Sequence, residues 1–426
     1  MASENQTNAS SPEGAAINMY NPRYIDIGIN LADPIFRGNY HGTQRHPDDL
    51  DAVVSRAQEV GCSKLIITGS DFTSSRHALD IAKEYPGTVY TTAGIHPCSS
   101  AIFSTANAHE DTDGHTMPCD PDPTQPIPEE HEPDLEKTSR IIAELKKLIE
   151  DARSQTPNAL IALGEFGLDY DRLHYCSKKI QLHSFAAQLD LVLAIKPQLP
   201  LFLHSRAAHR DFVDLLKAKF GDKLEKLEKG GVVHSFTGTI DEMRELMDLG
   251  LYIGTNGCSF KTADNCAVVK EIHLDRLMLE TDGPWCEVRP SHEGWKYLID
   301  SKPPTPAPTP DPAAAAAAAA AAVETSSAPA AAPAGVNGDA QQQQQRKPQK
   351  QVQKSKKPQK KEPEVPERWK TVKKEKWVEG AMVKGRNEPC SIERVGKIVA
   401  GIKGATVEEV CEAAWRNTVK VFGIDD

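Results

Sequence analysis

The most informative segment of this chain is Ala162-Leu163-Gly164-Glu165-Phe166-Gly167-Leu168-Asp169. An apolar run from Ala159 to Leu163 leads into it, and a continuous apolar run is typical of a strand that is buried on both faces. The run stops at a glycine, so we expect Glu165 at the carboxyl end of that strand. A carboxylate half out of a core needs a partner or a metal. Taken alone, the segment also fits a strand followed by a polar turn.

The same construction, an apolar run that ends in polar side chains, recurs along the chain. We expect strands near residues 24–30, 64–69, 89–97, 159–165, 200–204, 230–234, 251–257 and 276–282. We expect helices near residues 48–60, 74–85, 135–152, 178–195, 208–219, 240–249, 392–402 and 407–421. This alternation implies right-handed crossovers and a parallel sheet. Eight strands in about 280 residues fit a (β/α)8 TIM barrel, an α/β fold, better than an open sheet.

The carboxyl ends of all strands meet on one face of such a barrel, where active sites lie. That face would bring together Asn30, His96, Glu165, His204, His234 and Asp282. Imidazole and carboxylate suit Zn²⁺, Mn²⁺ and Fe²⁺, and carboxylates with several waters also suit Mg²⁺. A single histidine at such a place is usually an ordinary hydrogen-bonded residue. Two histidines, a glutamate and an aspartate at equivalent strand ends favour a site for one or two divalent ions.

The composition indicates that polar segments interrupt the barrel. A hydrophobic content of 39% and a mean hydropathy of −0.47 are low for a compact domain, so such segments must dilute an ordinary core. We expect residues 1–22 to be a disordered leader and residues 23–300 and 367–426 to be two parts of one barrel. Residues 104–133 are interpreted as an acidic, proline-rich loop insertion, and residues 301–366 as a low-complexity Pro/Ala/Gln/Lys insertion. The second insertion would follow strand 8, on the active-site face.

The charge and the cysteines bear on partners and location. A net charge of −10 argues against a globally basic nucleic-acid surface, although metal ions can give a nuclease local positive charge. Nine cysteines without a C-x-x-C pair suit a reduced cytoplasmic or nuclear protein, and no membrane span is expected. Residues 346–361 carry eight basic residues and no acid, which fits a solvated linker, a nuclear-import signal or a weak DNA tether.

Successive segments of the chain resemble the motifs of TatD-type metal-dependent deoxyribonucleases, and most of all their eukaryotic branch. The matching segments are Asp26-Ile27-Gly28-Ile29-Asn30-Leu31, Gly94-Ile95-His96-Pro97, Gly164 to Asp169, His204-Ser205-Arg206, His234-Ser235-Phe236-Thr237-Gly238, Glu280-Thr281-Asp282-Gly283-Pro284-Trp285 and Arg386-Asn387-Glu388-Pro389. The resemblance covers about residues 24–297 and 369–422. It implies a TIM barrel of the amidohydrolase superfamily that hydrolyses DNA phosphodiester bonds with divalent metals. An exonuclease action on single-stranded ends is implied by the family alone.

The resemblance also implies roles for individual residues. Glu165 would bind or bridge metal, His204 and His234 would be ligands, and Asp282 would be a ligand that also orients or deprotonates water. His96 would lie near the scissile phosphate.

Other residues of these motifs would support the site. Arg206 is a candidate phosphate contact, since a guanidinium can bind two phosphate oxygens, although a surface cation fits equally well. The expected supporting or helix-capping residues, which do not themselves bind metal, are Asp26, Asn30, Asn387 and Glu388.

One departure from the wider family concerns the metal. Many relatives begin with His-x-His on strand 1, where this chain has Gly28 and Asn30. Asparagine is a weak neutral ligand and glycine supplies none. We therefore expect weaker metal binding and a preference for Mg²⁺ or Mn²⁺ over tightly held Zn²⁺. Gly283 stands where alanine or serine is commoner, which we interpret as a minor change.

Two other functions stay open. An amide or ester hydrolase of the same superfamily is disfavoured because the strand-1 histidines and an obvious metal-bridging lysine are absent. A catalytically silent binding scaffold is disfavoured because the four main ligands are intact. We expect solvated side chains at His41, His46, His109, His115 and His131, and small buried side chains at Cys98, Cys258 and Cys286.

Overall fold

The structure is a computed structural model of the 426-residue chain and describes residues 20–106, 131–156, 158–299 and 365–424. The basic run at 346–361, His109, His115 and most of the expected leader and insertions lie outside the described residues, so those predictions stay open. The described residues belong to one compact unit, Met1–Ser301 together with Val365–Asp426.

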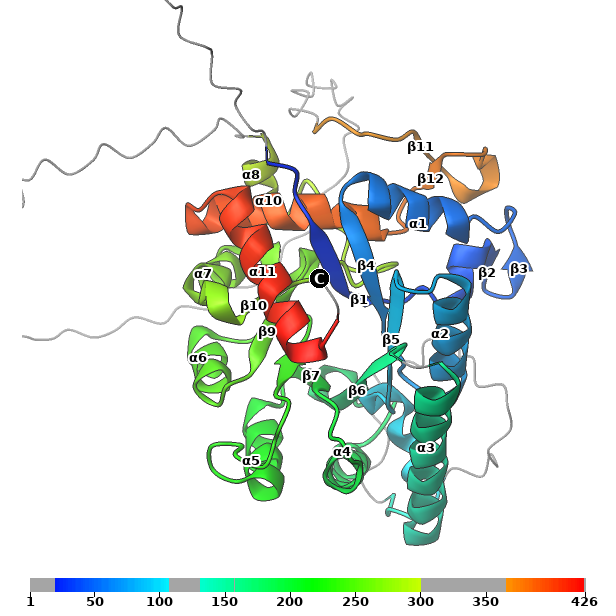
Figure 1. The fold of residues 1–426 in the computed structure, drawn as a ribbon, viewed down its shortest axis with the longest axis vertical. Helices are drawn as coiled ribbons and strands as arrows, with labels where there is room; N and C mark the ends of the chain where they lie inside the picture. The colour runs from blue at the N-terminus through cyan, green and yellow to red at the C-terminus, as the bar shows by residue number, and fades with distance from the viewer. Residues whose placement is uncertain (1–19, 107–130, 157, 300–364, 425–426) are drawn as a thin grey trace, which may run out of the picture. The chain divides into compact units, whose positions relative to one another are not determined.

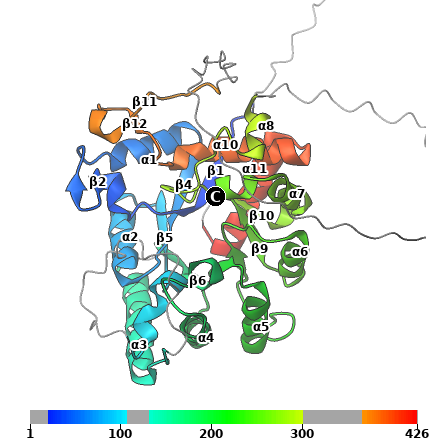
Figure 2. The same cartoon turned by 180° about the vertical axis from the view of Figure 1, so that it is seen from behind.

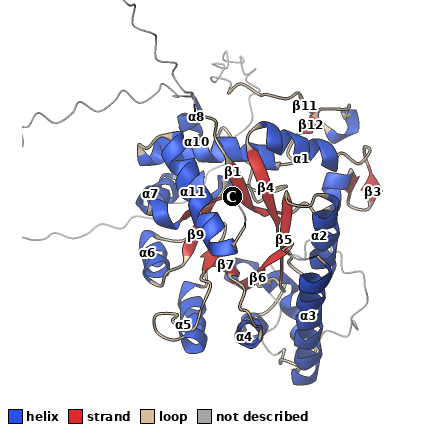
Figure 3. Cartoon of the chain, viewed as in Figure 1, coloured by secondary structure: helices blue, strands red, loops and turns tan. Residues whose placement is uncertain are grey.

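Eight parallel strands form the inner sheet, hydrogen-bonded to one another in chain order (Figures 1 and 3). They are β1 (Tyr24–Ile29), β4 (Cys62–Ile67), β5 (Val89–Ala93), β6 (Leu160–Asp169), β7 (Leu201–Arg206), β8 (Gly231–Val233), β9 (Tyr252–Thr255) and β10 (Leu277–Leu279). Each lies at a position expected from an apolar run. The prediction of a (β/α)8 barrel is confirmed.

The helices lie outside this ring of strands (Figure 3). They are α1 (Leu50–Glu59), α2 (Phe72–Glu84), α3 (Leu135–Gln155), α4 (Lys178–Ala194), α5 (His209–Phe220), α6 (Ile240–Asp248), α7 (Ala263–Glu271), α8 (Lys296–Ile299), α10 (Ile392–Lys403) and α11 (Val407–Phe422). The sequence did not predict α7, which completes the alternation after β9. Two short strand pairs lie beside α1 (Figures 1 and 2): β2 (Asn39–Tyr40) with β3 (Thr43–Gln44) is antiparallel, and β11 (Thr371–Val372) with β12 (Met382–Val383) is parallel.

Local sequence sets the helix ends. Thr239 and Glu242 form a capping box at the start of α6, and Thr406 and Glu409 form another at the start of α11. In each box the side chains satisfy two backbone N–H groups that the first helical turn leaves without partners.

The inside of the barrel is apolar and is closed at one end by the last helix. Ile25, Ile27 and Phe202 point into it from the strands, and Trp415 and Phe422 of α11 join the same buried cluster. Helix α11 therefore covers this end of the barrel, and the carboxyl ends of the strands lie at the opposite rim.

The seam between β1 and β10 is closed by the residues that follow β10. The N–H group of Asp282 donates to the carbonyl of Gly28 at 2.7 Å, and the N–H group of Asn30 donates to the carbonyl of Gly283 at 2.9 Å. The buried Asp26 carboxylate accepts hydrogen bonds from both the backbone N–H and the hydroxyl of Thr281. Closing the barrel therefore also fixes the backbone position of Asp282.

A pH dependence of stability follows for Asp26. Burial raises the pKa of this carboxyl to about 8, although the hydrogen bonds from Thr281 oppose the rise. A folded-state pKa above the unfolded value gives a contribution to stability that is complete below about pH 4 and is lost as pH rises towards 8. We expect Asp26→Asn, which keeps an acceptor oxygen, to become more stable relative to wild type by up to about 1.4 kcal/mol per pH unit between pH 5 and 8. Urea unfolding at several pH values measures this, and a pH-independent difference would contradict it.

Candidate metal centre

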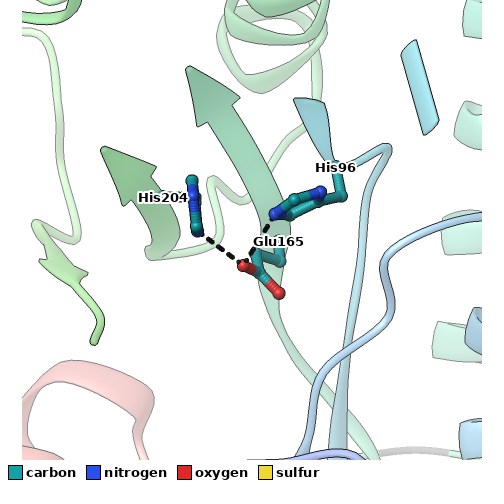
Figure 4. Close-up of side chains that lie close together, drawn as sticks. All are labelled: His96, Glu165 and His204. Carbon is teal, nitrogen blue, oxygen red and sulfur yellow. Dashed lines mark hydrogen bonds and ion pairs between the residues drawn. The ribbon is translucent and has the colours of Figure 1, made fainter. Parts of the chain in front are cut away.

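The carboxylate of Glu165 lies among three imidazoles at the carboxyl-terminal rim of the barrel (Figure 4 shows two of them). His96 follows β5 and begins the 3-10 helix η2 (Pro97–Phe103), His204 lies in β7, and His234 follows β8. Glu165 Oε1 is 2.7 Å from His234 Nε2, 2.9 Å from His204 Nδ1 and 3.3 Å from His96 Nε2. All four side chains are buried.

This donor set fits a divalent cation. His96, Glu165 and His204 each offer one ligand atom, and these three atoms lie within 4.8 Å of one another. The Nε2 atom of His234 lies 3.3 Å from the Nδ1 atom of His204. Imidazole and carboxylate are the ligands that zinc, manganese and iron take in proteins. The structure thus brings together four of the residues that the sequence singled out.

Two further carboxylates hold these histidines from behind. Asp169 Oδ2 lies 3.1 Å from His204 Nε2, and Glu280 Oε2 lies 3.4 Å from His234 Nδ1. A carboxylate on one ring nitrogen orients the imidazole and leaves the other nitrogen for a metal. The sequence analysis assigned neither residue a role. A signal was present for Asp169, because side chains four positions apart along a strand lie on the same face, here that of Glu165 in β6. Glu280 follows β10, so no such periodicity indicated it.

The structure explains why strand 1 has no histidines. A Cβ atom at Gly28 would lie 2.4 Å from Glu280 Oε2, so Glu280 occupies the space of a side chain there. Asn30 instead donates from Nδ2 to Asp282 Oδ1 at 3.1 Å and to the carbonyl of Gly283 at 3.0 Å. Asn30 therefore orients Asp282.

Asp282 is half-buried and lies beside the four-residue group. Its Oδ2 atom is 3.4 Å from Ser235 Oγ and 3.2 Å from Cys286 Sγ, and it is not among the atoms that lie within 4.8 Å of one another. Asn387 donates to the carbonyl of Thr281 at 2.9 Å and so steadies the residue before it.

The remaining expected site residues lie further out. Arg206 is half-buried at the end of β7 and helps to lower the pKa of Asp169, together with the larger effect of His204. Glu388 forms ion pairs with Arg56 at 2.8 Å and with Arg386 at 2.9 Å, and makes no side-chain capping hydrogen bond. It therefore holds the C-terminal segment to α1.

Charges in the centre are strongly coupled. Burial alone would raise the pKa of Glu165, but His234, His96 and the hydrogen bond from His204 hold it well below its usual range. Burial would lower the pKa of His234, but Glu165 and Glu280 raise it well above the ordinary value, and Glu165 likewise raises the pKa of His96. A metal ion must displace these protons, so its binding should strengthen as pH rises.

One expectation for the side residues is wrong. His46 is buried, because its ring stacks on Trp377 with centroids 5.2 Å apart and its Nε2 atom lies 3.2 Å from the hydroxyl of Tyr40. The covering tryptophan comes from a distant part of the chain, which local sequence does not reveal.

The cysteines follow the expectation more closely. Cys98 and Cys258 are buried, and Cys286 is half-buried. The Sγ atoms of Cys258 and Cys286 lie 2.8 Å apart, a proximity that their spacing in the sequence did not indicate.

Comparisons with known proteins agree with this geometry. A family model described as "TatD related DNase" matches residues 25–352. The "Deoxyribonuclease Tat-D" of Schizosaccharomyces pombe is 36% identical over 400 residues, which are 94% of this chain and 96% of that protein. The protein of the same name from Saccharomyces cerevisiae is 32% identical over 441 residues, with 94% and 91% covered. A "3'-5' ssDNA/RNA exonuclease TatD" of Erwinia tasmaniensis is 33% identical over 264 residues, with 61% and 80% covered.

Solved structures give the same fold. The crystal structure of an uncharacterized amidohydrolase from Saccharomyces cerevisiae superposes with a TM-score of 0.67 at 28% identity, covering 94% of this chain and 100% of that one. A TatD family hydrolase from Entamoeba histolytica gives a TM-score of 0.65 at 24% identity, with 96% and 100% covered.

The coupling of metal and protons can be measured through stability. A ligand at about 100 times its dissociation constant stabilises a protein by about 2.7 kcal/mol, which is a rise in Tm of roughly 4 °C for a domain of this size. We expect Mn²⁺ to raise the Tm of wild type, more at pH 8 than at pH 6, and EDTA to reverse the rise. Glu165→Gln should remove the effect, whereas Glu245→Gln on α6, a matched change outside the centre, should keep it. An equal rise in Tm for Glu165→Gln and wild type would exclude this centre as the binding site.

Proposed function

Because this chain belongs to the TatD-related DNase family, we propose that it is a divalent-metal-dependent deoxyribonuclease that degrades single-stranded DNA from its ends. Family membership makes the chain a hydrolase of phosphodiester bonds. The observation that carries the proposal is the buried Glu165 carboxylate among the imidazoles of His96, His204 and His234. Bacterial relatives are named 3'-5' ssDNA/RNA exonucleases. From that name we take both the attack on the ends of single strands and the 3′-to-5′ direction as proposals for this chain.

We assign the metal ligands to Glu165, His204, His234 and Asp282. Divalent ions held there would lower the pKa of water and neutralise charge on phosphoryl oxygens. Asp282, whose Oδ1 atom accepts a hydrogen bond from Asn30, would accept a proton from the attacking water. The other carboxylates, Asp169 and Glu280, keep the histidine rings in position.

Two residues are assigned to the phosphate. His96 lies on the Glu165 side of the centre and would donate a hydrogen bond to a phosphate oxygen. Arg206 lies at the end of β7, which is hydrogen-bonded to the β6 strand of Glu165. It has no ion-pair partner among the described residues, so its guanidinium is available to a second phosphate oxygen.

The metal is proposed to be Mg²⁺ or Mn²⁺ rather than tightly held Zn²⁺. Strand 1 contributes no imidazole, because Glu280 fills the space next to Gly28 and Asn30 is engaged with Asp282. Fewer nitrogen ligands favour the harder ions. Native mass spectrometry that found stoichiometric zinc after EDTA treatment would contradict this assignment.

An exposed aromatic side chain three residues after Asp282 favours single strands. The Trp285 residue is 60% exposed, and its backbone N–H group donates to the carbonyl of Asp282 at 3.0 Å. Unpaired bases stack on aromatic side chains, whereas the bases of a duplex are already stacked on one another. We assign Trp285 as the platform for a base next to the scissile phosphate.

The place of action is proposed to be the cytoplasm, the nucleus or both. Cysteines without disulfides in the described residues fit a reducing compartment. Among these residues no helix is both long and apolar enough to cross a membrane. Fluorescence microscopy of a tagged chain tests the location, and accumulation in the secretory pathway would contradict it.

The nuclease activity itself is tested with end-labelled DNA. We expect purified protein to degrade single-stranded DNA with Mg²⁺ or Mn²⁺ and not with EDTA, releasing label from the 3′ end first. Glu165→Gln should be slower by at least about 10²-fold, since even supporting residues of a metal site are worth 10–100-fold. Loss of activity in Glu165→Gln, purified in the same way, excludes a contaminating nuclease, and Glu245→Gln should stay active and controls for a general effect of substitution. If wild type and Glu165→Gln are equally inactive with every metal, a binding scaffold or an amide hydrolase becomes the favoured function instead of a nuclease.

Trp285 should affect recognition of the strand. Loss of one stacked base costs about 1–3 kcal/mol, so Trp285→Ala should raise the KM for single-stranded DNA about tenfold, and Trp285→Phe should restore most of the loss. Quenching of tryptophan fluorescence by an added oligonucleotide should fall in both variants because the reporting ring is gone. An unchanged KM in Trp285→Ala would rule out the stacking role.

A further inference from the structure

A pocket of about 350 Å³ lies between the β2 segment and the β11–β12 segment, outside the metal centre. Figures 1 and 2 show these two segments next to each other from both sides. The lining side chains that matter here are Tyr40, Lys373, Lys374, Glu375, Lys384 and Arg386. We call this feature the basic pocket.

Its positive charge is available to a ligand. Lys373 and Lys384 are exposed, and Lys374 lies with its Nζ atom 4.6 Å from the ring centre of Tyr40. None of the three lysines has an ion-pair partner within the part of the chain that the structure describes. Glu375 offsets one of these charges.

Arg386 fixes the wall of the basic pocket, and its charge is already paired with carboxylates. Its guanidinium binds both carboxylate oxygens of Asp49, at 2.8 and 2.6 Å, and one of Glu388 at 2.9 Å. The wall of the basic pocket is therefore fixed, while the three lysines carry the charge that faces outward. On a chain with a net charge of −10, such a local excess of cations is a specific place for a polyanion.

The walls of the basic pocket are joined along the chain to the rim that carries the metal centre. The β2 segment follows β1, and Arg386 precedes α10, so both walls are loops at the carboxyl ends of strands. Asn387, the residue after Arg386, donates its N–H group to the carbonyl of Pro284 at 3.1 Å, and Trp285 follows Pro284. The backbone of the pocket wall is thus hydrogen-bonded to the segment that connects Asp282 to Trp285.

We infer that the basic pocket binds the phosphodiester backbone of the DNA strand whose end lies in the metal centre. The inference rests on the proposed nuclease function and adds a second, sequence-independent contact. Lysines at phosphates fix the register of a strand without reading its bases. The pocket therefore holds the trailing strand while its end is cut.

Direct binding separates this role from cleavage. The probe is single-stranded dT12 labelled with fluorescein, in buffer with EDTA. Its fluorescence anisotropy is measured as the full chain is added, at several salt concentrations, and gives the binding constant. The variant carries Lys373→Gln, Lys374→Gln and Lys384→Gln. The matched control carries Lys223→Gln, Lys226→Gln and Lys229→Gln, three exposed lysines on the loop before β8, at the other end of the barrel.

We expect the pocket variant to bind dT12 at least about fivefold more weakly at low salt. The slope of log K against log salt should fall by about 2, because each lost phosphate contact on a single strand contributes about 0.7. The control variant should bind as wild type does, and circular dichroism should show both variants folded. A pocket variant with wild-type affinity and slope, or an equal loss in the control, would overturn the inference. Absence of metal-dependent cleavage by wild type would instead overturn the proposed function.

Discussion

The rest of the site depends on one buried negative charge, the carboxylate of Glu165. It lies at the rim of an apolar barrel, within 3.3 Å of imidazole nitrogens from three different strand ends. A lone carboxylate there would be costly to bury, so it requires cations, either protons on the histidines or a metal. The same charge therefore draws the ends of β5, β7 and β8 together and prepares them to exchange protons for a divalent ion.

A second constraint joins the fold to the chemistry at the seam of the barrel. The residues after β10 donate and accept the backbone hydrogen bonds that close the ring against β1, and Asp282 is one of them. Asn30, on the opposite side of the seam, orients the Asp282 carboxylate. Substitutions in the seam should thus alter both stability and the position of the Asp282 carboxylate, and the pH experiment on Asp26 isolates the first effect from the second.

The sequence predicted the barrel because each buried strand contains a short apolar run, with the rim residue within the last part of the strand or within three residues after it. It could not predict contacts set by tertiary register. Glu280 against Gly28 and Trp377 over His46 each join residues from distant segments, and no local pattern encodes such pairs. The roles of Glu165, His204, His234 and Asp282 remain predictions, for which the structure supplies proximity and the experiments above supply the test.

The position of α11 has a consequence for the time at which this enzyme can form. Glu165 and Asp282 emerge from the ribosome well before Trp415, which fills the base of the barrel, and Asn417, which binds the carbonyls of Leu274 and Leu277 beside β10. At 5–20 residues per second, this interval is on the order of ten seconds. During it the nascent chain has these two carboxylates but lacks the helix that closes the end of the barrel. The order of translation itself therefore delays a competent nuclease until the last helix is made.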